Sequence, residues 1–180
     1  MTDALAAAAS GAARIHTLFD ARCAQSPDHV FMHTKDGAWT LAELSQRVDV
    51  LQAELQSLGV GLGDRVLVAA ENCPEHVALI LACSRVGAWS CGVNARMSAG
   101  EWAAFAARAD ARVSYFTSAV SDAAAAHADR AQARDSAVPG LRRSDPRAEA
   151  KPQEGALAGR VAAMIFTSGT TGEPKGVMVS

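Results

Sequence analysis

The chain has 180 residues, of which 49% are hydrophobic and 20% charged, a composition typical of one globular domain with its own core. Its formal net charge of -2 provides no basic surplus for a phosphate backbone, and aromatic residues make up only 5%, so nucleic acid is not an expected partner. The longest strongly apolar run, 76–84, is too short to span a bilayer. Asp3 stands where a signal peptide carries positive charge, and we expect a cytoplasmic location.

The N-terminal third predicts two helices separated by a hairpin. After an Ala-rich, frayed start over 1–14, apolar residues recur at helical spacing from Ile15 until Pro27 stops the helix. Residues 30–33 and 38–39 are expected to be strands around an Asp36-Gly37 turn. Thr40 and Glu43 form a capping box for a helix that Gly59 ends. The buried stripe expected on it is Leu41, Leu44, Val48, Leu51, Leu55 and Leu58.

Strand and helix patterns alternate from Asp64 onward. Strands are expected at 65–70, 88–93 and 112–117, with one helix between Pro74 and Gly87 and another from the Ser98 capping box through Ala109. This order predicts an α/β fold in which helices flank layers of parallel sheet. Residues 121–134 are expected to form a further helix, and 135–159, rich in charge, Pro and Gly, a surface loop or linker outside the core. A strand follows at 161–166.

We expect no catalytic or metal-binding role for the cysteine and histidine residues. Cys23, Cys73, Cys83 and Cys91 form no C-x-x-C pair, so we expect free thiols, with Cys83 and Cys91 in the core rather than acting as nucleophiles. His29 and His33 could share one strand face, but no third ligand is near in sequence, and surface histidines are the expected outcome. We expect no metal ligands within these residues.

Residues 167–176 are the segment whose sequence indicates a binding site. It contains three threonines, one serine, three glycines and a lysine. Glycines let successive amide N–H groups face one anion, hydroxyls add donors, and lysine adds charge, so the segment is suited to a polyphosphate. It is not a Walker A loop, because Pro174 stands where that motif has its second glycine. The apolar 177–179 predicts a strand next, which makes this a loop between two strands. The alternative is a solvated surface hairpin, but ten consecutive positions agree with one functional pattern, and this disfavours the alternative.

Residues 165–177 closely resemble the AMP-binding signature of the adenylate-forming superfamily, which includes acyl-CoA synthetases, luciferases and adenylation domains of peptide synthetases. The resemblance extends over 15–180, through 40–66 and 72–96, although Ala95 replaces a usual proline. It implies the incomplete N-terminal part of the large AMP-binding domain: 15–134 as part of its first α/β subdomain, 135–159 as a linker, and 160–180 as a strand with the phosphate-binding loop.

The resemblance also implies a function. The family joins a carboxylic acid to a thiol, usually coenzyme A, through an acyl-adenylate made from ATP. By resemblance, the ATP-binding residues are Thr167, Ser168, Gly169, Thr170, Thr171, Gly172 and Lys175. Ligands for Mg²⁺ and the catalytic residues are expected beyond residue 180, so the chain alone is expected to be inactive. Phe166 with Thr170-Thr171 favours an acyl-CoA synthetase. The alternatives are a peptide-synthetase-like adenylation domain and a non-catalytic nucleotide-binding or interaction module.

Overall fold

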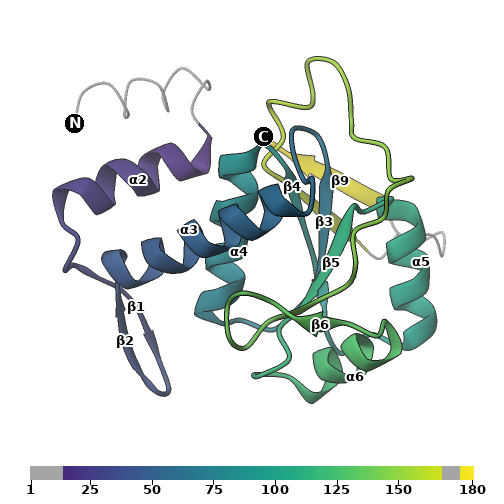
Figure 1. The fold of residues 1–180 in the computed structure, drawn as a ribbon, viewed down its shortest axis with the longest axis horizontal. Coiled ribbons are helices and arrows are strands. Elements are labelled where there is room, and N and C mark those ends of the chain that lie inside the picture. The colour runs from purple at the N-terminus through teal and green to yellow at the C-terminus, as the bar shows by residue number, and fades with distance from the viewer. Residues whose placement is uncertain (1–13, 168–174) are drawn as a thin grey trace.

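A mixed sheet forms the centre of the molecule (Figure 1). The computed structural model describes residues 14–167 and 175–180, and within these ranges the sheet has seven strands in the order β6-β7-β5-β3-β4-β8-β9. Parallel pairing joins β3 (Arg65–Ala70), β4 (Trp89–Asn94), β5 (Val113–Phe116) and β8 (Ala163–Thr167). The edges are antiparallel and consist of β6 (Arg134–Asp135), β7 (Arg142–Arg143) and β9 (Lys175–Val179). The predicted α/β fold with a parallel centre is confirmed.

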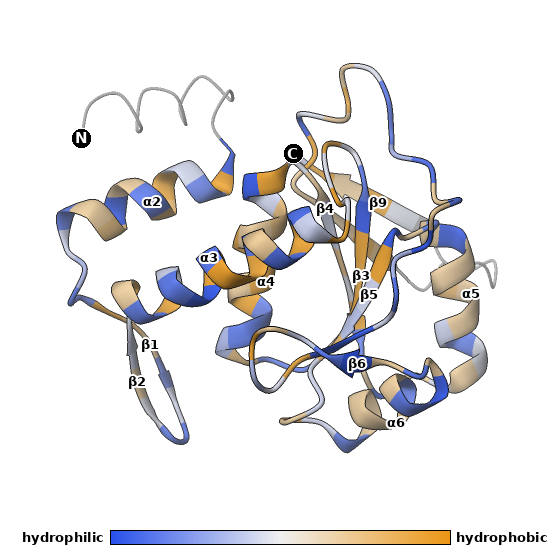
Figure 2. Ribbon diagram, in the orientation of Figure 1, coloured by the Kyte–Doolittle hydropathy of each residue, from blue (hydrophilic) through white to orange (hydrophobic). Residues whose placement is uncertain are grey.

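Helices cover both faces of the parallel strands (Figure 1). One layer contains α2 (Ile15–Gln25), α3 (Leu41–Ser57) and α4 (Pro74–Val86), and the other contains α5 (Ala99–Ala109) and α6 (Asp122–Arg130). Strand β3 shows the consequence, because Val66 and Val68 belong to the core with α3 and α4, whereas Leu67 packs with α5. Figure 2 shows the hydrophobic colouring of these buried strands. No helix in the described ranges is long and apolar enough to cross a membrane.

The helix boundaries follow the local signals that the sequence contains. Thr40 and Glu43 exchange hydrogen bonds at the start of α3, with the Thr40 amide 2.8 Å from the Glu43 carboxylate, and Ser98 and Glu101 do the same for α5. Pro74 opens α4, and Gly87 closes it in the left-handed region at φ 81°. The expected helix ends are confirmed. Five residues of the expected α3 stripe are buried, namely Leu41, Leu44, Val48, Leu51 and Leu55, whereas the sixth, Leu58, is only half-buried because it stands at the C-cap, where the helix has ended.

A separate hairpin precedes α3. Strands β1 (Val30–Thr34) and β2 (Gly37–Thr40) pair antiparallel and extend away from the main sheet (Figure 1). The turn is closed by Thr34, whose hydroxyl accepts a hydrogen bond from the Asp36 amide at 3.2 Å. The expected hairpin is therefore present. It also contacts α3, because the Cζ atom of Arg47 lies 5.2 Å from the centroid of the Trp39 ring on β2.

The other two tryptophans occupy different layers. Trp89 on β4 is buried, and its indole N–H donates to the Ala158 carbonyl at 3.1 Å. Trp102 on α5 has its ring 5.2 Å from that of Phe116 and 5.3 Å from that of His127, on the opposite side of the sheet from α3. The three indoles are thus distributed over hairpin, sheet and α5, and they form no common cage.

Two expectations need correction in the segment after β5. The helix expected over 121–134 ends at Arg130, because the Ala131 and Ala133 amides cap its last turn and Arg134 pairs with β7. The segment 135–159 is more than a surface loop, since Val138 and Leu141 join the main core and Ala150 and Ala158 are buried. Alanine content and local charge cannot reveal such long-range pairing, and tertiary contacts override helix propensity here.

Candidate phosphate-binding site

The candidate loop is framed by the β8–β9 hairpin. Antiparallel register places Thr167 opposite Lys175, Phe166 opposite Gly176, and Ile165 opposite Val177. The strands expected on both sides of the segment are thus confirmed, and their pairing brings the backbones of two candidate residues, Thr167 and Lys175, together. The other candidates, Ser168, Gly169, Thr170, Thr171 and Gly172, lie outside the described residues.

Strand β8 ends at the same edge of the sheet as the other parallel strands. Strand β8 runs parallel to β4, which runs parallel to β3, so the ends of these strands at Thr167, Asn94 and Ala70 share one edge. Ligands of open parallel sheets bind in the crevice beyond this edge. The topology therefore puts the end of β8 at Thr167 and the start of β9 at Lys175 at the edge where a ligand is expected.

One face of the hairpin is packed and the other is exposed. Met164 and Phe166 pack against a cluster that includes Leu67, Cys91 and Val93. The opposite face carries large apolar side chains with exposed fractions of 53% for Ile165, 50% for Val177 and 40% for Val179. Met178 of β9 pairs with Met164 and shares its face, but it is 49% exposed, so the packing on this side comes from β8.

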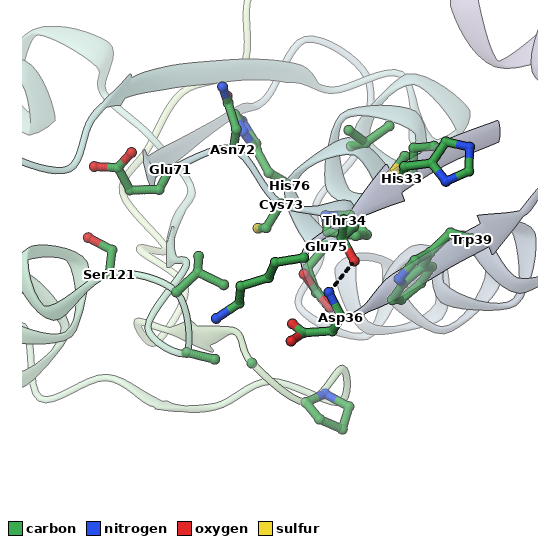
Figure 3. Close-up of a pocket in the computed structure, with 18 of the residues that line it drawn as sticks. His33, Thr34, Asp36, Trp39, Glu71, Asn72, Cys73, Glu75, His76 and Ser121 are labelled. Atoms are coloured by element: carbon green, nitrogen blue, oxygen red, sulfur yellow. Dashed lines mark hydrogen bonds between the residues drawn. The ribbon is translucent and has the colours of Figure 1, made fainter.

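A groove of about 1420 Å³ opens at the same edge of the sheet (Figure 3). Its walls are the β1–β2 hairpin, residues 71–77 between β3 and α4, Arg96, and residues 119–123 after β5. Arg96 pairs with Glu71 at 2.8 Å. This groove could not be predicted from sequence patterns, because its walls are far apart along the chain. The sequence feature that could have indicated the groove is the polar segment that follows each parallel strand.

Two partly buried ionisable groups of the groove wall, Cys73 and His76, have pKa values shifted towards their neutral forms. Burial raises the pKa of the Cys73 thiol to about 12, so that thiol is protonated at neutral pH. Burial lowers the pKa of His76, and its Nε2 is buried without a hydrogen-bond partner. His76 is therefore held as a neutral imidazole beside the wall of the groove.

The remaining candidates have structural roles. Cys83 and Cys91 are buried, and burial raises the pKa of both thiols, that of Cys91 to about 12, which confirms them as core residues. His29 and His33 are exposed, as expected. Asp64 accepts from the Gly61 amide at 2.9 Å and stabilises the turn before β3. Over residues 14–167 and 175–180, no three His, Cys, Asp or Glu side chains gather in a way that could hold a metal ion.

Comparisons with known proteins agree with this arrangement. The sequence model of the AMP-binding enzyme family matches residues 19–180. The medium/long-chain-fatty-acid–[acyl-carrier-protein] ligase FadD10 of Mycobacterium tuberculosis is 31% identical over 176 residues, covering 87% of this chain and 31% of the ligase. The feruloyl-CoA synthase of an Amycolatopsis species is 31% identical over 159 residues, covering 88% and 32%. This chain therefore spans about a third of the length of these relatives.

A solved structure shows the same likeness in three dimensions. The crystal structure of ATP-bound MatB from Rhodopseudomonas palustris superposes with a TM-score of 0.61 at 28% identity, covering 85% of this chain and 32% of MatB. The likeness in fold and the likeness in sequence thus both extend over most of this chain.

Proposed function

Because this chain belongs to the AMP-binding enzyme family, we propose that it supplies the phosphate-binding part of an ATP-dependent carboxylate ligase. The observation that carries the proposal is the signature segment between β8 and β9, at the carboxyl edge of a parallel sheet. In the proposed reaction, a carboxylate oxygen of the acid bonds to the α-phosphorus of ATP. The bond from that phosphorus to the bridging oxygen breaks, and pyrophosphate leaves with the electron pair.

The proposed role of the loop is to hold the leaving pyrophosphate. Residues 167–172 donate backbone N–H and hydroxyl hydrogen bonds to the β- and γ-phosphates, and Lys175 offsets the charge that develops as pyrophosphate separates. Phosphate transfers of this kind depend mainly on positioning and on neutralising charge, so a loop rich in donors with one cation is suited to them. We further propose that the enzyme works in the cytoplasm, where ATP and reduced thiols are available.

The second half of the proposed reaction transfers the acyl group from AMP to a thiol. We propose coenzyme A as the acceptor, which the likeness to a feruloyl-CoA synthase supports. An acyl carrier protein is a second candidate, because another relative is named as an acyl-carrier-protein ligase. Incubation of a complete enzyme containing this chain with acid, ATP and each thiol distinguishes them, since only the true acceptor yields a thioester with release of AMP.

The test on this chain is nucleotide binding. Isothermal titration of the purified protein with ATP and with inorganic tripolyphosphate should give saturable one-to-one binding for both, because the proposed contacts are to phosphates. AMP, which lacks the β- and γ-phosphates, should bind at least tenfold more weakly. Failure of both ATP and tripolyphosphate to bind would overturn the proposal.

A further inference from the structure

The β1–β2 hairpin is hydrogen-bonded to the rest of the molecule at its base. The Leu41 amide donates to the His29 carbonyl at 3.0 Å, and the Phe31 ring lies edge-to-face with that of Phe19 on α2, with 6.2 Å between the ring centroids. In the part of the chain that the structure describes, no hydrogen bond or ion pair joins residues 33–38 to a residue outside the hairpin. A two-stranded hairpin is only marginally stable by itself, so few contacts determine where its tip lies.

The pairing of the two strands is irregular close to this base. The register shifts between Val30 and Met32, so Phe31 is an extra residue on β1. A β-bulge of this kind bends the strand locally and is frequent beside functional sites. It lies between the fixed base and the tip at 34–37, where a change in the bend moves the tip as a unit.

The tip stands at the groove at the carboxyl edge of the sheet. Residues 33–36 line one wall and residues 119–123 line another, and Figure 3 shows Asp36 and Ser121 on opposite sides of the space between them. The groove volume of about 1420 Å³ exceeds the roughly 300–1,000 Å³ of a small-molecule site. The groove therefore encloses a small molecule only when its walls approach each other.

The two walls carry unpaired charges of opposite sign. Lys35 in the tip and Asp122 in the first turn of α6 both line the groove, and both are exposed. Among the residues that the structure describes, neither side chain has a hydrogen-bond or ion-pair partner. Arg96, the other cation that lines the groove, is paired with Glu71 at 2.8 Å. Lys35 is thus free to pair across the groove.

We infer that the β1–β2 hairpin is a flap that closes over the groove, with the bulge at Phe31 as its hinge and an ion pair between Lys35 and Asp122 as its closing contact. Closure narrows the groove and excludes water from the ends of β3 and β4, which is what lids do in enzymes. An exposed ion pair contributes little, so the open and closed forms are both populated and salt shifts them. The inference is independent of the proposed phosphate site.

Double electron–electron resonance tests the flap by measuring the distance between one spin label on the hairpin and one on the body. The labels are attached through Ala38→Cys beside the tip and Ala131→Cys after α6, both exposed positions. Cys23→Ser and Cys73→Ser remove the two half-buried thiols. We expect two distances, and we expect about 1 M NaCl to reduce the population of the shorter one.

Substitutions of the ion pair test the closing contact. Lys35→Met and Asp122→Asn should each lower the ratio of closed to open forms about two- to fivefold, the effect expected for an exposed ion pair. Exchanging the charges with Lys35→Asp and Asp122→Lys together should restore the ratio. The matched control is Lys151→Met, which removes an exposed lysine outside the groove and should leave the ratio unchanged.

Circular dichroism verifies that each variant folds, and Lys35→Gln replaces Lys35→Met if the latter is unfolded. A single distance at all salt concentrations would overturn the inference. Equal ratios in wild type and the Lys35 variant, an equal loss in Lys151→Met, or no recovery on charge exchange would overturn it as well. The proposed function stands in each of these cases, because it is tested by nucleotide binding.

Discussion

The hydroxyl of Tyr115 on β5 donates a 2.9 Å hydrogen bond to the buried carboxylate of Glu54 on α3. The same carboxylate accepts from the Ser136 hydroxyl at 2.7 Å, the Ala137 amide at 2.9 Å and the Arg143 guanidinium at 3.0 Å. Burial alone would raise the pKa of Glu54, but these four donors together hold it below its ordinary value. One carboxylate therefore joins a helix, a central strand and the segment between β6 and β7.

Replacing Glu54 by Gln should destabilise the fold by about 3 kcal/mol, because it leaves the largely buried Arg143 without its charge partner. Urea unfolding followed by circular dichroism gives the free energy of unfolding. The control is Glu154→Gln, an exposed position that should change stability by less than about 0.5 kcal/mol. A loss below about 1 kcal/mol for Glu54→Gln would show that this network contributes little.

His76 should make the fold less stable in mild acid. Burial lowers its native pKa below the ordinary 6.5, so the unfolded chain binds a proton there before the folded chain does. The stability tied to neutral His76 is complete above pH 6.5 and is lost as the pH falls through the native pKa. Urea unfolding from about pH 7.5 to about pH 5 should show a flatter profile for His76→Asn than for wild type. Parallel profiles would contradict the assignment.

Gly63→Ala should cost about 2 to 4 kcal/mol in the free energy of unfolding. Gly63 has φ +78°, and a Cβ there would overlap the carbonyl oxygen of Gln153, whose amide donates to the Gly63 carbonyl at 2.9 Å. Gly61 in the same turn is the matched control, since a Cβ on it meets nothing within 4 Å. Thermal unfolding of both variants tests the difference, and similar midpoints would refute it.

Lys175→Ala should weaken ATP binding about tenfold or more, because the proposed phosphate site loses its one lysine. Added NaCl should weaken wild-type binding more steeply than variant binding, since screening acts on the charge that was removed. Lys151→Ala, at an exposed lysine in 135–159, serves as the control and should bind as wild type does. In a complete enzyme containing this chain, Lys175→Ala should also slow adenylation. An unchanged affinity and an unchanged rate would remove Lys175 from the proposed site.

Local signals account for the parts of the fold that the sequence predicts. The capping boxes at Thr40 and Ser98, Pro74 and Gly87 act within a few residues, so they specify helix ends without reference to the rest of the molecule. The alternation of strand and helix patterns likewise predicts parallel pairing, because crossover connections are short and right-handed.

Long-range polar contacts account for what the sequence does not predict. Glu54 appears as one more polar residue within α3, and Arg143 as part of a charged run, yet the two meet across 89 positions. The periodicity of apolar residues along a helix does not distinguish a buried carboxylate that accepts from four hydrogen-bond donors from a carboxylate in solvent. The groove walls near Glu71 and Arg96 are equally hidden, because their proximity depends on how β3 and β4 end at one edge. The residues of the candidate loop are close together along the chain, so a local motif is enough to propose them as a site without long-range information.

The separation of Trp39, Trp89 and Trp102 gives each part of the fold its own fluorophore. Trp39 lies in the projecting hairpin, Trp89 is enclosed within the sheet, and Trp102 stacks near His127 between α5 and α6. Variants that retain one indole each would report emission from the hairpin, the centre and the α5 side independently. Unfolding curves that coincide for all three would identify a single cooperative transition, whereas an earlier curve from Trp39 would show the hairpin detaching first.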